Sequence, residues 1–176
     1  MKGKSPRLML AVIAGAVVCG VSAILNWPGI VVATPAVQFN SEILSRASFE
    51  EIAVNTRQGH GHEDADSKVR IQVEEPSDIY VVRNTVPPGG YSGWHTHPGP
   101  SVVLVKSGTA TVYNGDDPNC TPMTYAAGTG FIDQGGGHVH MVRNEGTTDL
   151  VTVAFQIIPA GADRRIDAPS PGHCPF

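Results

Sequence analysis

Two histidines one residue apart, His95 and His97, stand directly before an apolar run. In an extended strand the side chains alternate between the two faces, so both imidazoles point to one side and Thr96 points to the other. A second pair with the same spacing, His138 and His140, follows in Gly-Gly-Gly-His-Val-His. The spacing predicts that imidazole rings converge inside a β-structure. Neutral rings buried there need partners, and one metal ion can serve several of them.

Turn residues separate short apolar segments along the chain, which contains 20 glycines and 14 prolines. Strong turn signals occur at Pro87-Pro88-Gly89-Gly90 and at Asn114-Gly115-Asp116-Asp117-Pro118. We therefore expect an all-β sandwich or jelly-roll barrel, with strands at about 69–73, 79–86, 92–97, 102–106, 109–113, 130–132, 139–143 and 150–158. The segment 41–54 fits neither a helical nor a strand period cleanly, so helix and strand both stay open there.

The composition indicates one domain and excludes one class of partner. A chain of 176 residues with 41% hydrophobic side chains has room for a single core and a leader segment. Its net charge of −4 provides no basic surface that would attract the phosphates of nucleic acid. We expect no nucleic-acid partner.

The N-terminal residues differ from the rest of the chain. A few basic residues precede an uncharged apolar stretch from Leu8 to Leu25, a pattern typical of an export signal. The stretch is also about long enough for a membrane anchor. We predict a signal peptide or anchor helix at 1–36, an N-terminal segment with a polar loop at 37–68, and a β-barrel with a C-terminal tail at 69–176. The protein is expected to be secreted or periplasmic, or tethered to the cell envelope.

Cys120 and Cys174 are the cysteines that remain after removal of the leader. In an exported chain such a pair predicts a disulfide, which would tie the C-terminus to the barrel. Two free thiols are the alternative. Both cysteines stand in proline-rich, turn-like sequence that is typical of the surface, which argues against their binding a metal.

The spacing around the first histidine pair resembles the first motif of the cupin superfamily. That motif reads Gly, five residues, His-x-His, three or four residues, Glu, six residues, Gly. Here Gly89, His95, His97, Ser101 and Gly108 fall on these positions. Ser101 stands where the family usually has a metal-binding Glu.

The second cupin motif has a Gly and a Pro-x-Gly turn ahead of a His and an Asn. Gly128 fits its start, and His140 and Asn144 fit its end. The turn departs from the pattern, because Gln134 stands near the expected proline and the run Gly135-Gly136-Gly137 holds one extra residue. The resemblance covers roughly residues 70 to 158.

The resemblance implies a cupin-like jelly-roll barrel that holds a divalent metal ion, Zn, Fe, Ni, Cu or Mn, at His95, His97 and His140. His138 is a candidate fourth ligand. Replacement of the usual Glu by Ser101 removes one negative charge and one oxygen ligand, so hard ions such as Mn should bind less well. If His138 turned inward, zinc or copper would gain relative to manganese.

Three functions remain open from the sequence. The first is a metal-dependent oxygenase, isomerase or decarboxylase that acts on a small organic acid or a similar molecule. The second is a non-catalytic barrel that binds a small ligand or the metal itself as a sensor or carrier. The third is a structural barrel without metal that acts through dimerisation, and a homodimer is what the resemblance implies.

Overall fold

The computed structural model describes residues 32–58 and 67–176. These residues form strands and turns and contain no helix, so the prediction of an all-β fold is confirmed. The apolar stretch from Leu8 to Leu25, predicted to form a signal or anchor helix, lies outside the described residues. Within the described ranges, no helix has the length and apolar character needed to cross a membrane.

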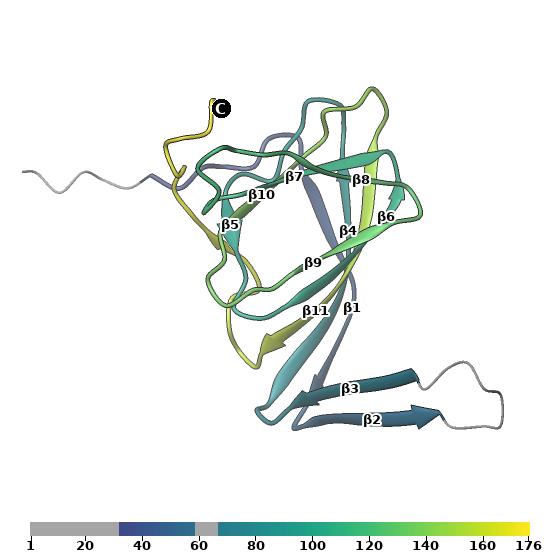
Figure 1. Ribbon diagram of the computed structural model, residues 1–176. Helices are drawn as coiled ribbons and strands as arrows, with labels where there is room; N and C mark the ends of the chain where they lie inside the picture. The colour runs from purple at the N-terminus through teal and green to yellow at the C-terminus, as the bar shows by residue number, and fades with distance from the viewer. Residues whose placement is uncertain (1–31, 59–66) are drawn as a thin grey trace, which may run out of the picture. The chain divides into compact units, whose positions relative to one another are not determined.

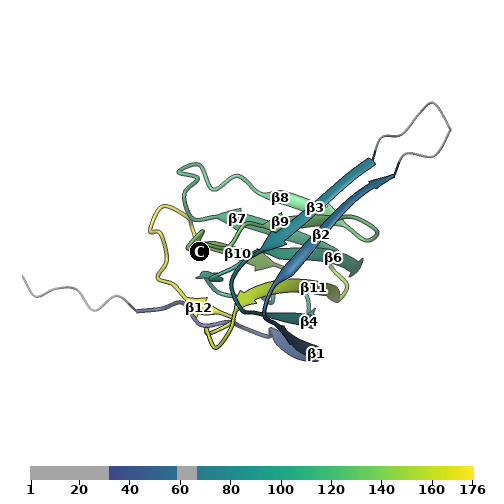
Figure 2. The same ribbon diagram turned by 90° about the horizontal axis from the view of Figure 1, so that it is seen from below.

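Two five-stranded antiparallel sheets face each other (Figure 1). The first has the order β1-β4-β11-β6-β9, with β1 at Asn40–Phe49, β4 at Ser77–Val86, β11 at Leu150–Pro159, β6 at Ser101–Ser107 and β9 at Gly130–Asp133. The second has the order β12-β5-β10-β7-β8, with β12 at Ile166–Asp167, β5 at His95–Thr96, β10 at His140–Arg143, β7 at Thr109–Asn114 and β8 at Met123–Ala126. A third sheet is the antiparallel pair of β2, Ile52–Gln58, and β3, Ser67–Val73 (Figure 2). Most neighbours within the two large sheets are distant in sequence, as in a jelly roll.

Most of the expected strands coincide with observed ones to within two residues, and the exception is the segment 92–97. Only His95–Thr96 is a strand there. Gly93 has a φ of +69°, and a Cβ at this position would lie 2.3 Å from the carbonyl oxygen of Thr34. The strand therefore cannot extend back through Gly93, because the N-terminal segment passes too close and the backbone is in the left-handed region.

The segment 41–54, left open between helix and strand, forms β1 and the start of β2. Strand β1 lies inside the predicted N-terminal segment 37–68 and adds an edge to the first sheet by pairing with β4. The pairing register shifts between Ile43 and Ser45. A bulge of this kind reverses the alternation of side chains partway along the strand, which explains why the segment shows no clean period of two.

A buried carboxylate joins β1 to β4. Asp78 on β4 accepts hydrogen bonds of 2.6 Å from Arg46 and from Ser48, both on β1. These hydrogen bonds lower the pKa of Asp78, and the bond from Arg46 has the largest effect. A carboxyl group whose pKa is lower in the folded than in the unfolded chain stabilises the fold at pH values above its pKa in the unfolded chain. The stabilisation from Asp78 should therefore be lost as the pH falls below about 4.

We therefore expect Asp78→Asn to lower the melting temperature at pH 7 and to lower it progressively less as the pH falls through 4. The measurement is thermal unfolding of the wild type and the variant between pH 3 and pH 7. Asp149, whose side chain is exposed, provides the matched control Asp149→Asn. A difference between Asp78→Asn and the wild type that stays constant with pH would contradict the assignment.

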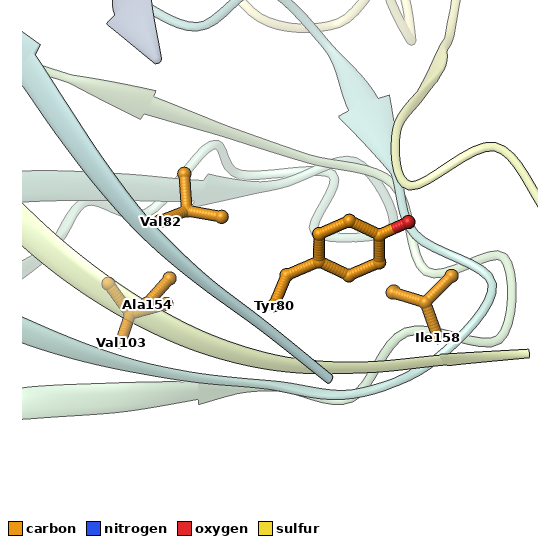
Figure 3. Packing of buried hydrophobic residues seen from close by; sticks show 5 residues of the cluster. All are labelled: Tyr80, Val82, Val103, Ala154 and Ile158. Carbon is orange, nitrogen blue, oxygen red and sulfur yellow. The ribbon is translucent and has the colours of Figure 1, made fainter. Parts of the chain in front are cut away.

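The inward faces of the strands form the core. Tyr80, Val82, Val103, Ala154 and Ile158, from β4, β6 and β11, pack together as one cluster (Figure 3). A second cluster, from β4, β6, β7 and β11, consists of Val86, Val105, Ala110 and Leu150. Along β6 buried and exposed residues alternate, so Ser101, Val103 and Val105 all face inward. These two clusters form an apolar part of the interior, and Ser101 enters the interior beside them.

Candidate metal centre

Three histidines meet inside the fold. His95 on β5 is paired directly with His140 on β10, and His97 follows β5. The ring centroids lie 4.3 Å apart for His95 and His140, 5.0 Å apart for His95 and His97, and 5.6 Å apart for His97 and His140. All three side chains are buried, and one ligand nitrogen from each lies within 4.8 Å of the others. The spacing of the histidines predicted that their rings converge, and the structure has a histidine cluster able to hold a metal ion.

The glycine run before His140 sets the register of the second motif. Gly135, Gly136 and Gly137 all have positive φ values, between 62° and 93°. A Cβ on Gly135 would lie 2.2 Å from the carbonyl oxygen of Gly99, so only glycine fits there. The run therefore absorbs the extra residue in a tight turn, and His140 becomes the first residue of β10, opposite His95.

Backbone carbonyl groups orient the rings. Nδ1 of His95 lies 2.9 Å from the carbonyl oxygen of Gly93, and Nδ1 of His97 lies 2.6 Å from that of Arg164. Nδ1 of His140 lies 3.4 Å from the carbonyl oxygen of His138. A carbonyl oxygen can only accept a hydrogen bond, so these contacts place the ring proton on Nδ1. In a neutral ring the lone pair is then on Nε2, which is free to bind a metal.

Burial keeps the three rings neutral. Desolvation, the largest effect at each, holds the pKa of His95 well below its ordinary value and also lowers the pKa of His97. It lowers the pKa of His140 to about 4, against an opposing effect of Asp133. At neutral pH the cluster is therefore in the uncharged form that coordinates metals.

Ser101 stands where the resembled motif has a glutamate and is held by its neighbours in the sheet. Its Oγ accepts a 2.9 Å hydrogen bond from Nε2 of Gln156, and Oε1 of Gln156 accepts a 2.8 Å bond from Arg164. Ser101 and Gln156 are opposite each other on β6 and β11, and both are buried. Gln156, which could have faced either side of its strand, therefore faces inward and fixes the Ser101 hydroxyl.

Asp133 is a residue of this site that sequence reasoning missed. It is the last residue of β9, is 5% exposed, and lines the same pocket as the three histidines. The predicted strand ended at residue 132, and no role was expected for the residue beyond it. Phe131 is partly buried and Ile132 is exposed, so one more step of the alternation turns Asp133 inward. Extending the strand by one residue would have identified it.

His138 lies beside the cluster, outside β10. Its ring stacks on that of His140, with centroids 6.2 Å apart, and its Nε2 lies 3.6 Å from Oδ1 of the exposed residue Asp116. One ligand nitrogen of His138 is within 4.8 Å of ligand atoms of Asp133 and His140. It is thus at the solvent side of the site, with 29% of its side chain exposed.

The predicted disulfide is present. Cys120 and Cys174 are bonded, with their Cα atoms 5.5 Å apart, which joins the loop after β7 to the C-terminal tail. Phe176 in the same tail packs against Tyr113, with ring centroids 4.8 Å apart. The tail is therefore fixed to the second sheet.

A family model matches the central part of the chain. Residues 82–156 match the family model described as Cupin domain. The chain is similar to the structure of an uncharacterized conserved protein with a double-stranded beta-helix domain from Klebsiella pneumoniae, at 26% identity over 51% of this chain and 74% of that one, with a TM-score of 0.44. It is also similar to that of a cupin domain from Bordetella pertussis, at 23% identity over 60% of this chain and 92% of that one, with a TM-score of 0.38. No curated protein matches it by sequence.

Proposed function

Over residues 82–156 the chain belongs to the cupin superfamily, and on that premise we propose that the protein binds a divalent metal ion and acts on a small organic molecule. The ligands are His95, His97 and His140. The observation that carries the proposal is the convergence of three buried rings whose Nδ1 atoms contact carbonyl groups, so that each Nε2 is free for a metal. Imidazole nitrogen suits Zn, Fe, Ni and Cu, and the bound metal would supply a Lewis acid.

Two arginines support a small organic acid as the ligand. Arg164 and Arg165 line a pocket that also contains His95, Asn84 and Ser41. The interior pocket beside it has an apolar wall, which includes Phe39, Val86, Val103, Phe131 and Leu150. An organic acid could place its carbon skeleton against the apolar wall and its carboxylate near the guanidinium groups, a pairing that arginine geometry favours.

A non-catalytic role, as a carrier or sensor, is the second candidate. Among the described residues that line the interior pocket, the one carboxylate is Asp133. If this group is engaged by the metal, the lining retains no second carboxylate to act as a general base. This scarcity of acid–base groups favours binding over turnover.

Metal analysis of the protein, purified full-length and without chelators, tests both candidates. We expect about one divalent ion per chain by elemental analysis, since three histidines form one site. Turnover or oxygen uptake with small organic acids would identify an enzyme, whereas metal without turnover would favour the carrier. A chain that carries no metal and takes up none on titration with Zn²⁺, Fe²⁺, Ni²⁺, Cu²⁺ or Mn²⁺ would contradict the proposal and favour the structural barrel.

Export and dimerisation belong to the same proposal. The disulfide supports an oxidising compartment, where such bonds persist. Exposed apolar side chains on the first sheet, between 39% and 63% exposed, support the pairing of two copies through this face; they are Val102, Leu104, Ile132 and Phe155.

A further inference from the structure

The carboxylate that the first motif lacks is present on the neighbouring strand. Ser101 on β6 is paired directly with Asp133 on β9. Side chains of directly opposed residues lie on the same face of an antiparallel sheet, so both point into the interior. Ser101 is too short to reach a metal as a glutamate would, whereas Asp133 carries a carboxylate to the same pocket from the adjacent strand.

The contacts of Asp133 leave one oxygen free for a ligand. Oδ1 accepts a 3.1 Å hydrogen bond from the backbone amide of Gly135. Oδ2 is buried and has no hydrogen-bond partner among the described residues. A buried carboxylate oxygen without a partner is costly, because it has lost its water and gained nothing in exchange. The environment of Asp133 is therefore incomplete without a further positively charged or donating group.

One distance suits a metal ion shared by Asp133 and His97. Oδ2 of Asp133 lies 3.7 Å from Nε2 of His97, the nitrogen that is free to bind a metal. Oδ1 lies 3.7 Å from Nδ1 of His140, which carries the ring proton and is not a metal ligand. Nitrogen and oxygen ligands each lie about 2.1 Å from a divalent ion, so two of them can be at most about 4.2 Å apart. The free oxygen of Asp133 and Nε2 of His97 meet this limit.

We infer that Asp133 is a fourth protein ligand of the metal, so that the carboxylate of this site has moved from β6 to β9. The inference rests on the proposed function. Asp133 restores the negative charge and the oxygen donor whose loss at Ser101 would disfavour hard ions. The site is then a three-histidine, one-carboxylate centre, and manganese is no longer at the disadvantage that the sequence alone predicted.

The test compares metal binding by the full-length wild type, Asp133→Asn and the control Asp149→Asn. Asparagine keeps the shape of the side chain and its bond with Gly135 but removes the charge. We expect Asp133→Asn to weaken Mn²⁺ binding by about 100-fold or more, beyond the range typical for loss of an outer-shell partner. The visible absorption spectrum of bound Co²⁺ should also change in Asp133→Asn, because its donor set changes. Asp149→Asn should leave both measurements as in the wild type.

A second variant distinguishes ligation from support of the fold. If the carboxylate itself is what the metal requires, Ser101→Glu introduced into Asp133→Asn should recover most of the Mn²⁺ affinity. Unchanged affinity and an unchanged Co²⁺ spectrum in Asp133→Asn would overturn the inference while leaving the three-histidine site intact. A wild type that binds no metal would contradict the proposed function itself.

The metal-loaded wild type gives a result that needs no variant. In its crystal structure, an Asp133 oxygen within about 2.2 Å of the ion would support ligation, since carboxylate ligands lie at about 2.0 to 2.2 Å from such metals. An ion bound by the three histidines with Asp133 beyond contact would overturn it, even if Asp133→Asn fails to fold.

Discussion

Replacing His97 with alanine is expected to weaken the binding of divalent metal by more than about 100-fold, because loss of a ligand should exceed the 10- to 100-fold cost of losing an outer-shell partner. His97 is buried, and its Nδ1 contacts the Arg164 carbonyl, so its Nε2 is fixed in the site. Alanine removes one of the three imidazole nitrogens and provides no ligand atom in its place. Competition with a chromophoric chelator, using Zn²⁺ and Mn²⁺ separately, measures the change.

The matched control is His173→Ala, which removes an exposed imidazole from the C-terminal tail. It should bind metal as the wild type does. Circular dichroism of each variant establishes that the strands are intact, so that loss of metal is not loss of fold. If His97→Ala retained the affinity of the wild type, the three-histidine site would be wrong, whatever the metal content of the purified protein.

The histidine cluster was predictable because it follows from local rules. Alternation along an extended chain places His95 and His97 on one side. The position of His140 could be predicted only in part, since its register depends on how the glycines at 135–137 turn. The structure shows that positive φ values at all three positions set it.

The positions of Asp133 and Gln156 opposite Ser101 could not be predicted from the sequence, for a different reason. Alternation along a strand can turn each side chain inward, but it does not determine which strands become neighbours, and these two residues lie on β9 and β11. The backbone of Arg164 is a similar case, because its carbonyl oxygen orients His97 from a segment that is 67 residues away. Contacts of this kind depend on the register between segments that are distant in sequence. The local sequence pattern therefore predicts the histidine ligands better than it predicts the residues that orient them.

Edges of the fold were also difficult to predict. The bulge between Ile43 and Ser45 hides the period of β1, and the close approach of Thr34 to Gly93 shortens β5. Both are effects of one segment on another. The inner strands, by contrast, carry runs such as 150–158 whose pattern survives because both neighbours pair regularly over most of their length.

Replacing both disulfide cysteines, Cys120→Ala with Cys174→Ala, is expected to lower the free energy of unfolding by about 4 kcal/mol. The bond closes a loop between residues 54 positions apart, and in the chain-entropy model its loss restores the freedom of that loop in the unfolded chain. For a chain of this size such a loss corresponds to a fall in melting temperature of roughly 10 °C. Scanning calorimetry of the wild type and the double variant measures it.

The other contacts of the C-terminal tail determine how far the tail stays in place when the disulfide is removed. Phe176 packs on Tyr113 and lies 4.3 Å from the guanidinium carbon of Arg143, so the tail keeps apolar and cation–π contacts without the bond. If those contacts hold the tail, Phe176→Ala should lower the free energy of unfolding more in the double cysteine variant than in the wild type.

A reducing agent provides the control for the disulfide. It should lower the melting temperature of the wild type and leave that of the double cysteine variant unchanged. Equal melting temperatures for the oxidised wild type and the double variant would show that the bond does not stabilise the fold.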